Sequence, residues 1–197
     1  MSAQRRHNTD GRIARGERTR EAILAAHTAL LRDGVLKPTA KTIAERAGVS
    51  LRTVWLNFKD MEALFAETTS YWQKADLELR EDIDPGLPLE DRIDAFCAQR
   101  ARRLEHLAPA ARSAALGEPF SPALARSRQV HVERVESDLA ATFRPELAAR
   151  TDRDVLARAL FVAASWPTWS SLRDDLGLDV DEAAAVMCHT LRVLLRT

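Results

Sequence analysis

Residues 43–64 read IAERAGVSLRTVWLNFKDMEAL, and this stretch decides the fold. Ile43 and Ala44 lie on one side of Gly48, and Val54 and Phe58 follow it four residues apart, so helical spacing is present on both sides of the glycine. Glycine ends helices because it adopts the left-handed conformation without a steric penalty, and Ser50 can cap the helix that follows. The stretch therefore predicts two short helices joined by a sharp turn, which is the helix-turn-helix motif.

Helical spacing continues in both directions from this motif. A stripe of apolar residues with period 3.6 predicts a helix over residues 18–32, and another predicts a helix over 60–79. Further helices are expected at 88–107, 109–116, 122–143, 152–175 and 179–196, with Pro167 kinking or interrupting the fourth of these. No strand pattern occurs, so the fold class is all-α, with about nine helices.

The charge is distributed unevenly along the 197 residues. The chain has 29 basic and 29 acidic residues. Residues 1–60 hold 12 Lys and Arg against 6 Asp and Glu, a net charge of +6, which leaves 17 basic and 23 acidic residues, a net charge of −6, for residues 61–197. This asymmetry indicates a polyanion-binding module joined to a second domain. We expect a mobile basic arm at 1–15, a DNA-binding domain at 16–60 and a second helical domain at 61–197.

Several classes of protein are excluded by what the sequence lacks. No apolar window reaches the length of a membrane span, and no apolar segment follows the basic residues near the start, so we expect a cytoplasmic protein. Cys97 and Cys188 are far apart in sequence and predict two buried free thiols. The histidines have no metal-ligand spacing, and no P-loop, nucleophile elbow or GxGxxG occurs. We therefore expect no metal, no cofactor and no catalytic residues, which argues against an enzyme.

The run over about residues 18–66 closely resembles the DNA-binding region of the TetR family of bacterial transcriptional regulators. The resemblance implies a homodimer whose amino-terminal three-helix modules read a palindromic operator, with a helical carboxy-terminal domain that dimerises and holds a small-molecule pocket. Two residues depart from the family pattern. Trp55 stands where a tyrosine is usual, and Met61 stands where a lysine is usual and cannot neutralise a phosphate. Whether Lys59 compensates for Met61 is left open by the sequence.

The exposed face of the second motif helix supplies the expected DNA contacts. Arg52 can form two hydrogen bonds with guanine, and the Ser50 hydroxyl can hold a phosphate. The alternative for these residues is an ordinary solvated helix face. The candidate DNA-binding residues are Thr39, Lys41, Ser50, Leu51, Arg52, Thr53, Trp55, Leu56, Asn57 and Lys59.

The second domain has candidates for two further surfaces. Aromatic and histidine side chains could line a ligand pocket or belong to the plain core; they are Trp72, Phe96, His106, His131, Phe143 and Trp166. The last two predicted helices carry more apolar residues than one core face needs, which predicts a dimer interface in the form of a four-helix bundle. The candidate interface residues are Val155, Ala159, Val162, Ala163, Trp166, Ala183, Met187, Thr190, Leu191 and Leu194.

The expected function is that of a dimeric, ligand-responsive, sequence-specific DNA-binding transcriptional regulator, a repressor that a small molecule releases from a palindromic operator. Its partners would be double-stranded DNA, a second copy of the chain and an unidentified effector, with no membrane. The alternative is a helix-turn-helix regulator without a small-molecule effector, controlled by its abundance or by a protein partner. Neither the effector, nor the operator, nor the choice between repression and activation follows from the sequence.

Overall fold

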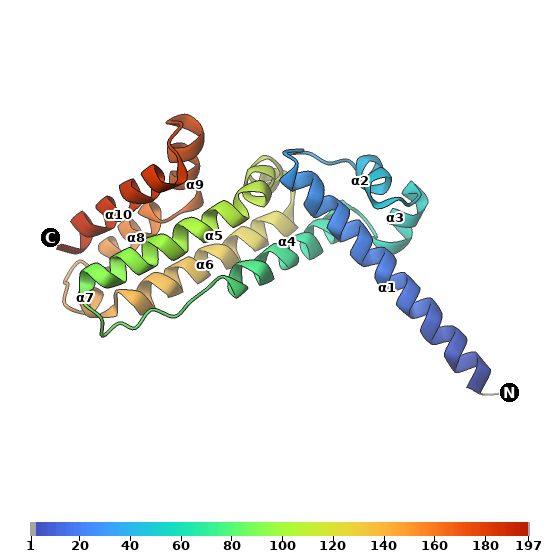
Figure 1. Cartoon of the computed structure of the whole chain (residues 1–197), viewed down its shortest axis with the longest axis horizontal. Helices are drawn as coiled ribbons and strands as arrows, with labels where there is room; N and C mark the ends of the chain where they lie inside the picture. The colour runs from blue at the N-terminus through green and yellow to red at the C-terminus, as the bar shows by residue number, and fades with distance from the viewer. Residues whose placement is uncertain (1–2, 197) are drawn as a thin grey trace. The chain divides into compact units, whose positions relative to one another are not determined.

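The computed structural model describes residues 3–196, with side chains from residue 14 onwards (Figure 1). These residues form helices and connecting loops and contain no strand, which confirms the all-α prediction. None of the described helices is both long enough and apolar enough to cross a bilayer. In chain order the elements are α1 (Ala3–Arg32), α2 (Ala40–Ala47), α3 (Leu51–Asn57), α4 (Met61–Glu78), α5 (Leu89–Gly117), the 3₁₀-helix η1 (Glu118–Phe120), α6 (Pro122–Thr142), α7 (Arg144–Ala148), α8 (Arg153–Ala163), α9 (Trp166–Ser170), the π-helical turn η2 (Ser171–Asp175) and α10 (Val180–Arg196).

Two helix boundaries differ from the prediction. The structure continues α1 back to Ala3, whereas the sequence placed a mobile arm at 1–15 and the helix start near Gly16. The residues from Ala3 to Arg15 include the good helix formers Ala, Gln and Arg, although residues 7–11 (His, Asn, Thr, Asp and Gly) favour a helix less. The helices expected at 88–107 and 109–116 are one helix, α5, which contains Pro109. Proline removes one hydrogen bond and bends a helix, but good helix formers on both sides allow it to continue.

The interruption expected at Pro167 is confirmed. Helix α8 ends at Ala163, and α9 begins at Trp166 with Pro167 in its first turn. Ser165 between them is extended, with φ −82° and ψ 157°. Its hydroxyl donates a hydrogen bond to the Val162 carbonyl at 2.8 Å, which satisfies one of the carbonyls at the end of α8.

The chain divides into two compact units. Unit 1 comprises Met1–Trp72 and Pro109–Ser127, and unit 2 comprises Gln73–Ala108 and Arg128–Thr197. Helices α4, α5 and α6 each contribute to both units. The core of unit 1 is built from α1 to α4, and the predicted apolar positions Ile43, Val54 and Phe58 all lie in it. Its buried members are Ile23, Ala26, Leu30, Ile43, Ala44, Val54, Phe58 and Leu64.

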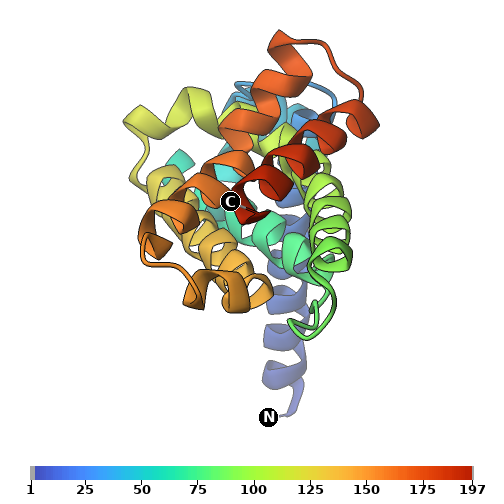
Figure 2. The same cartoon turned by 90° about the vertical axis from the view of Figure 1, so that its left-hand side faces the viewer.

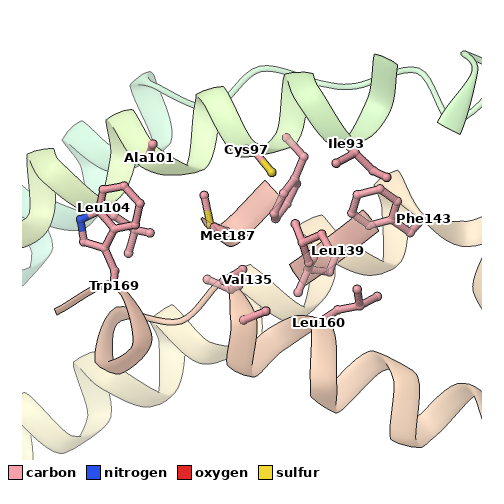
Figure 3. Close-up of a cluster of buried hydrophobic side chains, with 14 of the residues drawn as sticks. Ile93, Cys97, Ala101, Leu104, Val135, Leu139, Phe143, Leu160, Trp169 and Met187 are labelled. Carbon is pink, nitrogen blue, oxygen red and sulfur yellow. The ribbon is translucent and has the colours of Figure 1, made fainter. Parts of the chain in front are cut away.

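The core of unit 2 lies between α5, α6, α8, α9 and α10. Figure 2 shows α10 between α5 and α8, and Figure 3 shows side chains from these helices pointing towards a common centre, among them Leu104, Val135, Leu160 and Met187. Cys97 is buried in this core and Cys188 is half-buried at its edge, and both are free thiols. Burial raises the pKa of both thiols above the ordinary value.

Candidate nucleic-acid interface

Helices α2 and α3 form the helix-turn-helix, and local interactions fix both helix starts. The Thr39 hydroxyl accepts a hydrogen bond from the Thr42 amide at 3.1 Å, and the Ser50 hydroxyl accepts one from the Thr53 amide at 3.0 Å. Gly48 ends α2 with a φ of 66°. A Cβ at Gly48 would meet no atom within 4 Å, so the left-handed φ, not lack of space, favours glycine there. The glycine turn and the Ser50 cap follow the sequence prediction.

One side of α3 is anchored in unit 1. Val54 and Phe58 are buried beneath the helix, and the Phe58 amide donates to the Val54 carbonyl at 2.9 Å. On the opposite side, Leu51, Arg52, Trp55 and Leu56 are exposed, with Leu56 as much as 73% exposed. Helix α3 therefore exposes a row of side chains to solvent, while its opposite side is packed in the core of unit 1.

A residue that the sequence did not single out also holds α3. The Arg20 guanidinium, from α1, forms two hydrogen bonds with the Glu67 carboxylate on α4 and donates to the carbonyl of Asn57, the last residue of α3. Its Cζ also lies 4.2 Å from the centre of the Phe58 ring. Arg20 thus satisfies a carbonyl at the end of α3 and joins three helices at one point. Arg20 and Glu67 are 47 positions apart in the sequence, so no local pattern shows this pairing.

We expect Arg20→Gln to lower the free energy of unfolding by about 1–2 kcal/mol, because it removes charge-assisted hydrogen bonds that are only partly shielded from solvent. Chemical denaturation measures the effect. Arg18→Gln is the matched control, since Arg18 lies on the same helix and, among the residues whose side chains are described, bonds only the Ala14 carbonyl. In a double-mutant cycle with Glu67→Gln, a coupling free energy below about 0.3 kcal/mol would contradict this role for Arg20.

The predicted DNA-binding residues differ in how many hydrogen bonds their polar groups already form within the protein. The Ser50 and Thr53 hydroxyls lie 2.8 Å apart and are bonded to each other, and the Asn57 amide donates to the Thr53 carbonyl at 2.8 Å. Thr39 and Lys41 are exposed near the start of α2, and the Lys41 ammonium lies 3.9 Å from Glu45. Ser50, Thr53 and Asn57 thus spend part of their hydrogen-bonding capacity on shaping α3.

Two exposed cations on or beside α3 remain uncommitted. Within the described part of the chain, Arg52 and Lys59 form no hydrogen bond or ion pair with another residue. Met61 stands where the TetR-family pattern has a lysine, and it is half-buried against the core of unit 1. It therefore serves packing, and Lys59 is the nearest exposed cation in sequence.

The six candidates for a ligand pocket lie in different surroundings. Trp72 is buried in unit 1, where the Arg32 guanidinium lies 5.0 Å from its ring centre. In unit 2, the rings of Phe96 and Phe143 pack edge to face with centres 5.5 Å apart. His131 Nε2 lies 3.3 Å from Arg100 Nη2, and His106 and Trp166 are half-buried.

Two hollows in unit 2 involve mostly other residues. One, of about 280 Å³, has apolar walls and charged groups at its rim. The other, of about 40 Å³, includes Phe96. The larger hollow is lined by Glu136, Leu139, Ala140, Leu147, Asp154, Ala157 and Arg158. No group of three or more His, Cys, Asp or Glu side chains positioned to share a metal ion occurs among the described residues.

The assignment of four predicted dimer-interface residues is corrected by their burial in one chain. Ala163, Ala183, Met187 and Leu191 are buried within the core of unit 2 and are not available to a second chain. The sequence could not separate them from exposed residues because α10 carries apolar side chains on more than one stripe.

The other predicted interface residues keep solvent contact. Val155 is 66% exposed and Val162 is 58% exposed, and they lie seven residues apart on one face of α8. Val186 and Val193, also seven residues apart, are exposed on α10. Ala159, Trp166, Thr190 and Leu194 are partly exposed.

Unit 1 therefore contains a helix-turn-helix module, and the chain belongs to the class of all-helical proteins that expose one face of a short, well-anchored helix. No family model and no curated protein matches the sequence. Among solved structures, the chain is similar to a candidate TetR-family transcriptional regulator from Mesorhizobium loti, with 19% identity, a TM-score of 0.66 and coverage of 92% of this chain and 97% of that one. It is also similar to a transcriptional regulator from Rhodococcus sp. Rha1, with 18% identity, a TM-score of 0.68 and coverage of 92% and 96%. The chain has the fold of TetR-family regulators.

Proposed function

We propose that this chain is a sequence-specific DNA-binding transcriptional regulator that acts as a homodimer. The observation that carries the proposal is the exposed face of α3, where Arg52 is uncommitted while Val54, Phe58 and Arg20 hold the helix from behind. In this proposal residues 16–60 form the DNA-binding module, and residues 61–197 serve dimerisation and regulation. The fold shared with two regulators supports it.

In the proposed complex, α3 enters the major groove and reads bases with its exposed side chains. Arg52 donates two hydrogen bonds to the N7 and O6 atoms of a guanine. Leu56 has no polar group and suits contact with a thymine methyl group. Lys41, Lys59 and the Trp55 indole N–H lie beside α3 or on it and would hold phosphates, which fixes the register of the protein but carries no sequence information.

The proposed dimer uses the exposed valines of α8 and α10. A two-fold axis would pack the exposed faces of α8 and α10 against the same two helices of a second chain, as in a four-helix bundle. Two α3 helices then meet successive major grooves about 34–36 Å apart, which requires an operator with two inverted half-sites. We propose repression with release by a small molecule. The second candidate is a regulator without an effector, and the close packing of Phe96 against Phe143 favours it, because those residues then serve only as core.

We expect Arg52→Ala to weaken binding to the preferred DNA by about 1–3 kcal/mol and to relax the base preference at one position in each half-site. The preferred sequence is first obtained by selecting bound duplexes from a random pool, which should return an inverted repeat. Affinities for the selected duplex and for random duplex are then measured at one fixed salt concentration, because phosphate contacts make both depend on salt.

Arg144→Ala is the matched control for this experiment, since Arg144 is an exposed, uncommitted arginine of unit 2 on α7. It should change neither affinity. An equal loss on selected and random DNA in Arg52→Ala would reassign Arg52 to a phosphate. Failure of the selection to enrich any sequence would overturn the proposed function.

A further inference from the structure

Arg100, on α5, lies in the interior of unit 2 with only part of its hydrogen-bonding capacity used. Its side chain is 2% exposed. Nε donates to the Ala164 carbonyl at 2.8 Å, and Nη2 lies 3.3 Å from His131 Nε2. Nη1 is buried and has no hydrogen-bond partner within the described residues. A guanidinium has five N–H donors, so more than half of those of Arg100 are unsatisfied.

The carboxylates around Arg100 are committed to other cations. Both oxygens of Asp76 accept from Arg103, at 2.8 Å each. Asp138 accepts from Arg103 through one oxygen and from Arg80 through the other, at 2.7 Å each. Among the residues that the structure describes, Arg100 therefore has no ion-pair partner of its own, although a charge buried this deeply is normally paired.

The Arg100 guanidinium keeps its charge, and the imidazole beside it is neutral. Burial, and then the nearby charge of Arg103, lower the pKa of Arg100 to about 10, so the guanidinium stays charged at neutral pH. Burial and the charge of Arg100 lower the pKa of His131 to about 4, so the imidazole is neutral there and cannot repel a cation or neutralise an anion. The charges of Asp76 and Asp138 act on Arg100 without bonding it, because their oxygens bond Arg103 and Arg80; Arg80 also pairs with Asp82.

Arg100 stands among apolar core residues in the sequence of α5. Phe96, Cys97 and Leu104 lie three or four residues away on the same helix, on the side that faces the core. Leu160 from α8 and Val135 from α6 belong to the same core as these three residues (Figure 3). An occupant of this place would need one anionic group for Arg100 and an apolar body for these side chains.

We propose that Arg100 binds the carboxylate of a small organic acid with an aliphatic or aromatic body. This inference rests on the proposed function, because the acid would be the effector of the regulator. The carboxylate accepts hydrogen bonds from Nη1 and Nη2 in the planar two-bond geometry that arginine favours. Arg100 is closed off from solvent in this structure, so occupation requires the helices around it to part, which is the kind of change that a regulator can transmit.

The experiment measures the thermal unfolding of the full chain without DNA. The probes are octanoate, phenylacetate and benzoate, each compared with its neutral amide and with sodium chloride at equal ionic strength. We expect at least one carboxylate to raise Tm by about 2 °C or more, because a ligand that binds only the folded state stabilises it. The amides and the chloride should leave Tm unchanged. Arg100→Gln should abolish the rise, whereas Arg102→Gln, an exposed arginine on the same helix that pairs with Glu81, should keep it.

The proposal is overturned if no carboxylate raises Tm, if the amides raise it equally, or if Arg100→Gln keeps the rise. If Arg100→Gln fails to fold, two other measurements test the proposal. One compares acid with amide on the unchanged protein, and the other repeats the titration on Arg100→Lys. Arg100→Lys keeps the charge but loses the paired donors, so we expect at least a tenfold weaker response. DNA binding by α3 is measured in a separate experiment. If no acid binds, the DNA-binding proposal is unaffected, and if no DNA sequence is selected, acid binding can still be measured.

Discussion

Asp76→Asn is expected to lower the free energy of unfolding by about 3 kcal/mol, the largest effect on stability that we anticipate for a polar residue of unit 2. The Asp76 side chain is 1% exposed and that of Arg103 is 2% exposed, and two hydrogen bonds of 2.8 Å join them. The substitution leaves the Arg103 charge buried with only part of its compensation. Because Asp138 still pairs with Arg103, the loss should fall at the lower end of the range for broken buried ion pairs. Denaturation in urea near pH 7 measures it.

Asp82→Asn is the control, since Asp82 pairs with Arg80 but its side chain is 88% exposed, and its loss should cost less than about 0.5 kcal/mol. The double substitution Asp76→Leu with Arg103→Met removes both charges, so it should recover much of the lost stability. A double variant less stable than Asp76→Asn alone would contradict the view that the unpaired charge causes the loss.

The same pair makes a signed prediction for pH. Burial by itself would raise the pKa of Asp76, but the hydrogen bonds and the charge of Arg103 outweigh burial and hold it below the ordinary value of 3.8. A carboxyl group whose pKa is lower in the folded state stabilises the fold fully above its unfolded pKa and progressively less as the pH falls below it. The stabilisation by Asp76 should therefore weaken below about pH 4. The free energy of unfolding of Asp76→Asn should lack this part of the decrease at low pH.

The second large effect is expected from Val162→Asp, which should weaken the proposed dimer at least about 100-fold. Val162 is 58% exposed on the face of α8 that we assign to the interface. A two-fold axis places each substitution in the interface twice, so one change introduces two carboxylates that would have to lose water without a partner. Sedimentation equilibrium over a range of concentrations measures the dissociation constant.

Val130→Asp is the matched control, because Val130 is an exposed valine on α6 outside the proposed interface. Val193→Asp on α10 should act like Val162→Asp. If both interface variants dimerise with the affinity of the unchanged chain, the interface must lie elsewhere. If the unchanged chain is a monomer at all concentrations, the dimer itself is wrong.

The helix-turn-helix could be predicted from the sequence because its determinants are local. Gly48 must be left-handed to end α2, Ser50 must cap α3, and the four-residue spacing of Val54 and Phe58 sets which side of α3 is buried. Each of these features depends on residues within one or two turns of each other. The exposure of Arg52 followed from the same spacing.

The rest of the candidate sites depends on contacts between distant residues. Arg20 meets Glu67 across 47 positions, and Arg100 meets the Ala164 carbonyl across 64. A helical stripe shows that Met187 and Leu191 are apolar, but only the packing of α10 shows that they face the core while Val186 and Val193 face solvent. Pockets and cores use the same aromatic residues, so Phe96 and Phe143 could not be assigned before their edge-to-face contact was known.

The two native thiols have a practical consequence. Burial raises the pKa of both Cys97 and Cys188, so little thiolate forms at neutral pH and both react slowly with alkylating reagents. A cysteine introduced at an exposed position can then be modified selectively with a spin label or a fluorophore while the native pair stays in place. Electron-spin or energy-transfer distances between such labels would report how the two units move when DNA or an acid is added.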